Sequence, residues 1–213
     1  MQPQDTGFVS LIRERVLPSE NRSMFWFRSD PPNVGDWIGP YLFHAITGQY
    51  PIFTKPKRWY VTSCFLTVGS VMHNIRRDGN AVVWGSGVLS AHDKFCRPKQ
   101  VPAVRGPLSR ERFFDQGYDC PEVYGDPAIL MPRYYEAKPT SEKRGYGVIP
   151  HLVDCEIIHQ DRPTDVQFID VRQPVEQFID AIASCDVTFS SSLHGLIVSH
   201  AYGVPSVLSL IHI

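Results

Sequence analysis

The sequence predicts an α/β protein built on parallel or mostly parallel sheets with helices on both faces. Apolar segments of strand length alternate with amphipathic helical segments along the chain, which is the pattern of that class. The 213 residues, of which 43% are hydrophobic and 20% charged, are enough to bury a large core. Glycine, serine, asparagine or histidine follows most of the apolar segments. Because ligands of open α/β sheets bind beyond the carboxyl ends of the strands, these residues are the candidates for a functional site.

In the first 132 residues the pattern predicts one complete Rossmann-like domain. Its helices should begin at an N-cap Asp36 and at Leu108, and glycine closes each of them, at Gly48 and Gly117. The strands are runs rich in valine, isoleucine and aromatic residues. They are expected at 24–27, 60–68, 81–84 and 101–104, with a further short extended segment at 122–124.

After a polar stretch at 133–145, which is expected to be a linker, the alternation resumes in a partial second domain at 146–213. Strands are expected at 146–149, 166–171 and 187–189. The helix predicted at 174–184 has proline in its first turn and apolar residues at i, i+3, i+4 and i+7. A last helix follows the serines at 190–192, and Gly203 closes it.

The last six residues, 208–213, have two interpretations: a sequencing adapter can encode them, or they begin a genuine strand. In either case the alternation stops just after a helix. We therefore expect the chain to be a C-terminally truncated fragment that is inactive by itself.

Composition excludes several classes of function. The net charge of −1 argues against a nucleic-acid partner. Five scattered cysteines without a C-x-x-C pair argue against a disulfide framework or a structural zinc site, so we expect no metal. The first residues lack the pattern of a secretory signal, and no apolar run is long enough to span a bilayer. We expect a cytoplasmic protein.

The segment 186–205 carries the clearest functional signal. An apolar strand runs through Ser191 and Ser192 into Leu193, His194 and Gly195 and then into an apolar helix. Such a turn directs backbone N–H groups and the positive end of a helix at one point, which favours an anion. His194 stands at that point, although a buried histidine bonded to a carbonyl is the alternative reading.

Other candidates also follow predicted strands. Asn33, Gly35 and Asp36 form one such loop, in which Asp36 alone is more simply explained as an N-cap. Gly85 and Ser86 could form a phosphate loop or an ordinary turn. Arg105 is either an anion ligand or a surface side chain. His151 is either a ligand contact or a loop residue. Their shared place after strands favours a common site.

With these residues in view, the chain resembles the polysaccharide pyruvyl transferase family, especially its bacterial exopolysaccharide branch. Six segments carry the resemblance, in the family's order: FWFRSDPPNVGDWIGPYLFHAITG, NAVVWGSGV, AVRGPLSRERF, YGDPAILMP, YGVIPHLVD and SSSLHGLIVSHAYGVPSV. The resemblance implies two Rossmann-like domains of GT-B-like architecture. It also implies transfer of a pyruvyl group from phosphoenolpyruvate to two hydroxyls of a sugar, which forms a cyclic ketal.

The resemblance assigns roles to particular residues. The family's Arg-Leu-His motif falls on Ser192, Leu193 and His194, so His194 is the expected general acid and the arginine is replaced by Ser192. Arg105 is then the first choice for the missing positive charge. The implied partners are phosphoenolpyruvate, as a substrate with no separate cofactor, and a saccharide or lipid-linked acceptor, compatible with peripheral membrane association. The alternatives are a GT-B-like glycosyltransferase, a sugar-nucleotide epimerase, or a non-catalytic carbohydrate-binding module.

Overall fold

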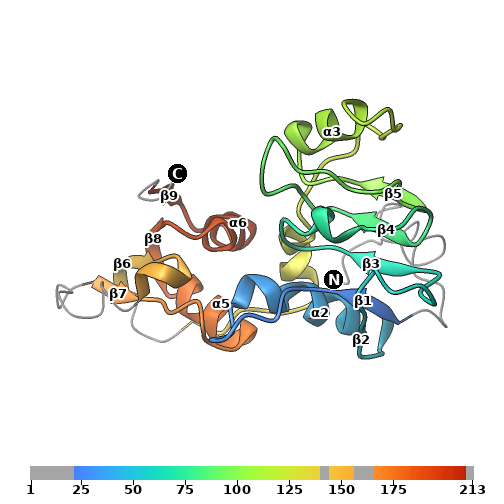
Figure 1. Ribbon diagram of the computed structural model, residues 1–213. Helices are drawn as coiled ribbons and strands as arrows, with labels where there is room; N and C mark the ends of the chain where they lie inside the picture. The colour runs from blue at the N-terminus through green and yellow to red at the C-terminus, as the bar shows by residue number, and fades with distance from the viewer. Residues whose placement is uncertain (1–21, 140–143, 156–165, 210–213) are drawn as a thin grey trace. The chain divides into compact units, whose positions relative to one another are not determined.

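The computed structural model describes residues 22–139, 144–155 and 166–209. Contacts divide these residues into two compact units (Figure 1). Unit 1 comprises the described residues up to Phe27 together with Gly39–Pro127. Unit 2 comprises Arg28–Ile38 and the described residues from Ala128 onward. Residues 28–38 therefore group with a part of the chain about a hundred positions later, for which the sequence gives no sign. The boundary expected near residue 132 and the linker at 133–145 stay predictions.

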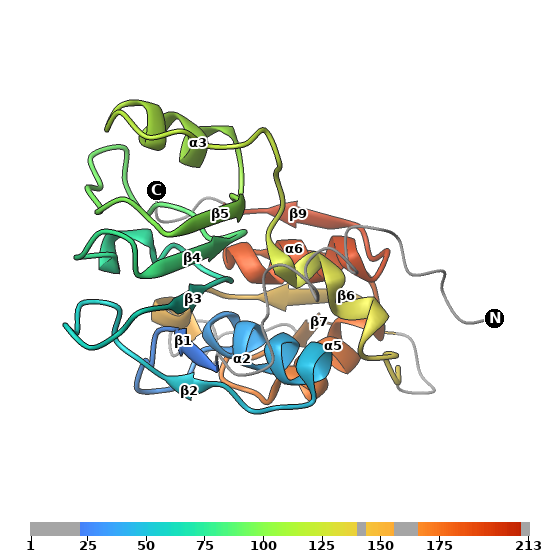
Figure 2. The same ribbon diagram turned by 90° about the vertical axis from the view of Figure 1, so that its right-hand side faces the viewer.

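Unit 1 is built on a five-stranded sheet. Its strands are β1 (Ser23–Phe25), β2 (Ile52–Phe53), β3 (Cys64–Leu66), β4 (Ala81–Trp84) and β5 (Gln100–Ala103). They stand in the order β2-β1-β3-β4-β5, which Figure 2 shows from bottom to top. Every pairing among them is parallel, so their carboxyl ends share one edge. In this order the direction of winding reverses between β1 and β3, where open α/β sheets bind ligands.

The core of unit 1 forms because its central strands are apolar on both faces, as parallel strands must be when helices cover them. Phe65, Leu66 and Val83 are fully buried in β3 and β4. The helix α3 (Pro107–Phe114) adds the buried ring of Phe113, which packs edge-on against Phe95 with 4.9 Å between ring centroids. A short 3-10 helix, η1 (Met72–Asn74), completes this cluster with Met72.

Unit 2 is built on a second parallel sheet, of four strands. These are β6 (Arg144–Ile149), β7 (Val166–Phe168), β8 (Cys185–Ser190) and β9 (Ser206–Leu208), in the order β7-β6-β8-β9. All three pairings are parallel. The winding direction therefore reverses between β6 and β8, as it does between β1 and β3 in unit 1. The two parallel sheets with their helices confirm the predicted α/β fold.

The helices of unit 2 are α5 (Val175–Ala183) and α6 (Leu193–Ala201), which contact each other and both contact β8. The predicted apolar stripe of α5 is confirmed, because its four residues are buried, namely Val175, Phe178, Ile179 and Ile182. Two 3-10 helices, η2 (Pro127–Arg133) and η3 (Leu152–Asp154), flank β6 in the sequence. Residues after η2 are held by Asp180 of α5, which accepts hydrogen bonds from the Tyr135 hydroxyl at 2.9 Å and from the backbone N–H of Lys138 at 2.7 Å.

The helix α2 spans Val34–Thr47, so the prediction that Asp36 is its N-cap is wrong. The helix begins two residues earlier, and Asp36 lies in its first turn. The side-chain oxygen of Asn33 accepts a hydrogen bond from the N–H of Gly35 at 3.0 Å and so satisfies the helix start. The Val34 N–H donates to the carbonyl of Val171 at 2.7 Å, which ties this turn to the loop after β7.

Candidate functional site

The serine turn between β8 and α6 is folded by its own hydroxyls. The Ser190 hydroxyl donates to the carbonyl of Ser192 at 2.7 Å and accepts from the Ser192 N–H at 3.1 Å. Ser192 is the N-cap of α6, and its hydroxyl accepts from the Gly195 N–H at 3.4 Å. Only 6% of Ser192 is exposed. Ser192 therefore caps a helix.

Sheet order places this turn beside the loop that contains His151. Both follow the carboxyl ends of neighbouring strands, β8 and β6, at the point where the winding reverses. The N–H of His151 donates to the Ser191 hydroxyl at 2.8 Å, and that hydroxyl donates to the Asp154 carboxylate at 3.4 Å. The exposed His151 ring caps η3 by accepting from the Val153 N–H at 3.4 Å. Two predicted site residues, His151 and Ser191, are thus in direct contact.

The ring of His194 lies against Gly35, although 159 positions separate them in the chain. A Cβ atom at Gly35 would overlap the Nδ1 atom of His194 and would lie 2.9 Å from its Cγ. Only glycine allows this approach, because real Cβ atoms essentially never come so close to a ring atom. The first turn of α2 and the first turn of α6 therefore meet through one glycine and one histidine.

Asp36 completes this group. Its carboxylate accepts a hydrogen bond from the Ser29 hydroxyl at 3.0 Å and interacts electrostatically with His194. Burial raises the pKa of Asp36 above its ordinary value, while the Ser29 hydrogen bond and His194 each act to lower it. A half-buried carboxylate beside an imidazole at the start of a helix is an acid–base pair next to a region that favours anions. All members of this pair and its supports belong to unit 2.

Arg105 occupies a separate position in unit 1, just beyond the carboxyl end of β5. Its Nη2 donates to the Ser70 hydroxyl at 2.8 Å and to the Val88 carbonyl at 3.2 Å. Ser70 follows β3, so the guanidinium reaches toward the edge where the winding of this sheet reverses. Burial lowers the pKa of Arg105, and the nearby Asp126 carboxylate partly opposes this shift.

One donor of Arg105 is available to a ligand. Among the described residues its Nη1 has no hydrogen-bond partner, although the atom is buried. A buried cationic donor without a partner is costly, and such atoms usually have a bound ion, water or ligand. The guanidinium also lies on Gly87, where a Cβ would come within 2.6 Å of it. The interpretation of Arg105 as a simple surface arginine is therefore disfavoured.

The predicted Gly85–Ser86 turn helps to hold the loop that contains Arg105. The fully buried Ser86 hydroxyl donates to the Gly69 carbonyl at 2.9 Å, and the Ser86 carbonyl accepts from the Arg105 N–H at 3.1 Å. Gly85, at a φ of 78°, receives the ring of Pro127. Both residues therefore shape the loops that hold Arg105, and they do not form an open phosphate-binding loop.

Sequence reasoning missed four polar residues that support the candidates, namely Ser29, Ser70, Asp126 and Asp154. Ser70 and Asp126 do follow apolar segments, which is a weak signal. Ser29 and Asp154 have no signal that separates them from other loop residues. Among the described residues no group of three or more His, Cys, Asp or Glu side chains is arranged to hold a metal ion. None of the helices in the described ranges has the length and hydrophobicity that a membrane crossing requires.

Comparison with known proteins places the chain in a family. The model of the polysaccharide pyruvyl transferase family matches residues 75–210, well over half of the chain. The "Uncharacterized protein L143" of Acanthamoeba polyphaga mimivirus is 29% identical over 180 residues, which is 81% of this chain and 62% of that protein. The chain thus spans less than two thirds of this relative's length. No solved structure matches significantly. On the family match, which includes the His194 turn and Arg105, the chain belongs to the polysaccharide pyruvyl transferase family.

Proposed function

We propose that the protein transfers the pyruvyl group of phosphoenolpyruvate to two hydroxyls of a saccharide. The methylene carbon of the enol gains a proton, two C–O bonds form at C2, and the bond from C2 to the phosphate oxygen breaks. One hydroxyl proton ends on the new methyl group and the other on the released phosphate. The donor carries its own leaving group, so the reaction needs no cofactor. The acceptor is an exopolysaccharide or a lipid-linked repeat unit.

The contact of His194 with Gly35, together with its electrostatic interaction with Asp36, is the observation that carries this proposal. Protonation of the methylene requires an acid that works near neutral pH, and an imidazole meets that requirement. His194 donates the proton, and the Asp36 carboxylate, which interacts electrostatically with it, lies beside it. General acid catalysis of this kind contributes roughly 10²–10⁴-fold to the rate.

Each unit has one positively polarised feature that suits an anion such as the donor's phosphate or carboxylate. The start of α6 presents backbone N–H groups and the positive end of the helix. Arg105, with its unpartnered Nη1, provides planar donors that suit either anion. Both features offer the positive charge that Ser192, in place of an arginine, does not provide.

The proposal is tested on the protein expressed from its complete reading frame. Calorimetric titration should show binding of phosphoenolpyruvate and none of UDP-sugars at the same concentration. With a saccharide acceptor, NMR should show the methyl signal of a pyruvyl ketal and release of phosphate. Preferential binding of a UDP-sugar would favour a glycosyltransferase or an epimerase. Binding of saccharide alone, with no donor bound, would favour a non-catalytic module.

His194→Ala separates the acid from the anion ligands. Turnover should fall by roughly 10²–10⁴-fold, because the proton donor is lost, while the affinity for phosphoenolpyruvate changes by less than about threefold. Unchanged turnover would place His194 among structural residues. His200→Ala, which removes an exposed histidine in the last turn of the same helix, is the matched control.

A further inference from the structure

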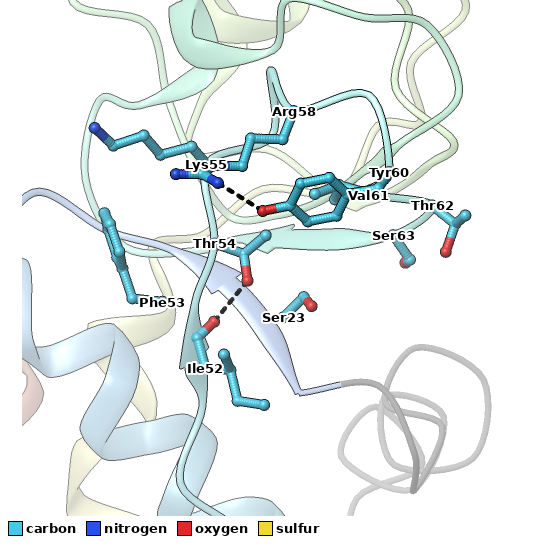
Figure 3. Close-up of a pocket in the computed structure, with 10 residues that line it drawn as sticks. All are labelled: Ser23, Ile52, Phe53, Thr54, Lys55, Arg58, Tyr60, Val61, Thr62 and Ser63. Carbon is cyan, nitrogen blue, oxygen red and sulfur yellow. Dashed lines mark hydrogen bonds between the residues drawn. The ribbon is translucent and has the colours of Figure 1, made fainter.

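Unit 1 contains a cavity of about 480 Å³ (Figure 3). Ser23, which begins β1, and Thr62 and Ser63, which precede β3, line it. Because the strands are parallel, their starts and their carboxyl ends lie at opposite edges of the sheet. The lining also includes β2 and residues that follow it, but none of its residues belongs to the candidate site described above.

The lining of this cavity combines cations, an aromatic ring and hydroxyls. The exposed side chains of Lys55 and Arg58 border it. Arg58 donates from Nη1 to the Tyr60 hydroxyl at 2.8 Å, and its guanidinium carbon lies 5.7 Å from the centroid of that ring. Tyr60 is 55% exposed, so its ring remains available for contact. Hydroxyls complete the lining, from Ser23, Thr54, Thr62 and Ser63. Hydroxyls and an exposed ring suit a sugar, and the cations suit an acidic one.

The charge of this region differs from that of the whole protein. The chain has 21 basic and 22 acidic residues, yet residues 37–77 contain five Lys or Arg and no Asp or Glu. Such an imbalance creates a positive local field that raises the concentration of anionic ligands nearby. The five cations are Lys55, Lys57, Arg58, Arg76 and Arg77.

A second cavity, of about 600 Å³, lies beside the start of β5 and repeats the pairing of cations with aromatic rings. Arg97 lies 5.1 Å from the centroid of the Tyr118 ring, and Arg110 lies 4.7 Å from that of Phe114. Lys99, which is exposed, also lines it, and Asp119 is the one acidic residue of its lining. Two separate hollows at the starts of parallel strands thus pair guanidinium groups with aromatic rings.

The spacing of the strands relates the two cavities. β4 lies between β3 and β5, and neighbouring strands are about 4.8 Å apart, so the starts of β3 and β5 are separated by about 10 Å. A chain of a few sugar rings covers such a distance. We propose that this edge, defined by the two cavities, binds an acidic glycan through its carboxylates.

This proposal rests on the proposed function and extends it to the acceptor. Each pyruvyl ketal leaves one carboxylate on the glycan, so the product of the reaction is more acidic than the acceptor. The edge binds a carboxylate-bearing stretch of the polymer while other residues carry out the chemistry. A lipid surface is a poorer match, because the cations lie in two hollows, the first of them lined with hydroxyls, rather than on a protruding apolar face.

The test measures binding by the complete protein, without phosphoenolpyruvate. The probes are a hexamer of galacturonate, the neutral maltohexaose, and phosphatidylcholine vesicles with one fifth phosphatidylglycerol. The hexuronate should bind, and its affinity should fall as salt rises from 50 to 200 mM. Maltohexaose should bind at least tenfold more weakly, and the vesicles should not compete with the hexuronate.

Variants locate the site. The double variant Lys55→Ala, Arg58→Ala should weaken hexuronate binding about tenfold or more. Adding Lys99→Ala to it should weaken the binding further. Lys94→Ala removes an exposed cation that lines neither cavity, so it should leave the affinity unchanged. Thermal unfolding and phosphoenolpyruvate affinity should stay the same in all of them.

Three results would overturn the proposal: equal binding of maltohexaose, binding of vesicles in place of the hexuronate, or an equal loss of affinity in Lys94→Ala. Hexuronate binding that follows the variants, without any ketal formation, would keep this site and refute the proposed function instead.

Discussion

At the scale of single residues, two charged side chains are held partly out of water: Asp36 in the first turn of α2, in unit 2, and Arg105 just beyond β5, in unit 1. Burial raises the pKa of Asp36 and lowers the pKa of Arg105, and each shift favours the uncharged form of the side chain. Groups with such shifts are concentrated at functional sites, since a structure without function to serve would expose or fully pair them. Substitution of either residue should therefore change the stability and the activity of the protein differently.

Asp36→Asn should stabilise the protein at neutral pH and reduce its activity. Because burial raises the pKa of Asp36 above 3.8, the folded protein binds this proton more tightly than the unfolded chain does. The cost of the buried charge is present above the raised pKa and disappears toward pH 3.8. Asparagine removes that cost and still accepts from Ser29. The Tm difference should be positive at pH 7 and shrink as the pH falls, while turnover drops by roughly 10²-fold or more.

Calorimetry from pH 7 to pH 4 checks this prediction. A variant that is less stable than the wild type by the same amount at every pH would contradict it. Ser29→Ala, which removes the hydroxyl that favours the ionised form, should lower the Tm more at pH 7 than at pH 4.

Arg105→Ala should weaken the binding of phosphoenolpyruvate by about one to two orders of magnitude. A charge-assisted contact to an anion contributes roughly 1.5–3 kcal/mol, which corresponds to that loss. Arg105→Lys keeps the charge without the planar donors, so its affinity for phosphoenolpyruvate should lie between those of the wild type and Arg105→Ala. Titration calorimetry measures the three affinities. An unchanged affinity in Arg105→Ala would mean that the donor's anions bind elsewhere.

At the scale of elements, the sequence predicts the strongly patterned segments well. β4 has the predicted bounds, 81–84, and α5 lies within the predicted range 174–184 with the expected face buried. The strand expected at 60–68 is shorter, because only Cys64–Leu66 pair with β4, and of these only Phe65 and Leu66 also pair with β1. The segment 122–124 forms one isolated bridge, between Val104 and Tyr124. The short strands β2 and β9 have too few residues to show a pattern.

The site is less predictable than the fold. The placement of Ser191 and His151 after neighbouring strands follows from the α/β alternation, and their hydrogen bond agrees with it. The contact of Gly35 with His194 does not follow, because it depends on which helix starts meet in space. Local patterns contain no information about residues 159 positions apart.

Gly35→Ala tests that contact between α2 and α6. Alanine favours helix, so by propensity alone the change should stabilise α2 by roughly 0.5–1 kcal/mol. The added Cβ instead overlaps the His194 ring, which should destabilise the protein by roughly 1–3 kcal/mol and displace the ring. Chemical denaturation and turnover should both decline. Gly145→Ala, where the added Cβ has open space, is the matched control; an unaffected Gly35→Ala would contradict the contact.

At the scale of the whole molecule, the reactivity of the five cysteines shows which parts of the chain exclude solvent. Within the described ranges all five are free thiols, and four are buried. Burial raises the pKa of Cys64 to about 12 and that of Cys120 to about 11. At pH 8 these two therefore have far less reactive thiolate than an ordinary cysteine, by about a hundredfold or more.

Cys96, which is half-buried, should consequently react first with a thiol reagent in the native protein. Mass spectrometry of the labelled peptides measures the order, and Cys96→Ser should abolish the fast phase. A fast reaction at Cys64 under native conditions would show that the core of unit 1 opens readily.

The assembly of unit 2 from two distant stretches of chain has a consequence for biosynthesis. Val34 leaves the ribosome 137 residues before Val171, the carbonyl that its N–H will bond. At about 5–20 residues per second, the interval between them is roughly 7–27 s. During that time Val34 and Ile38, which end fully buried, lack their final neighbours. Nascent chains arrested before residue 171 should therefore be the ones that chaperones bind at this segment.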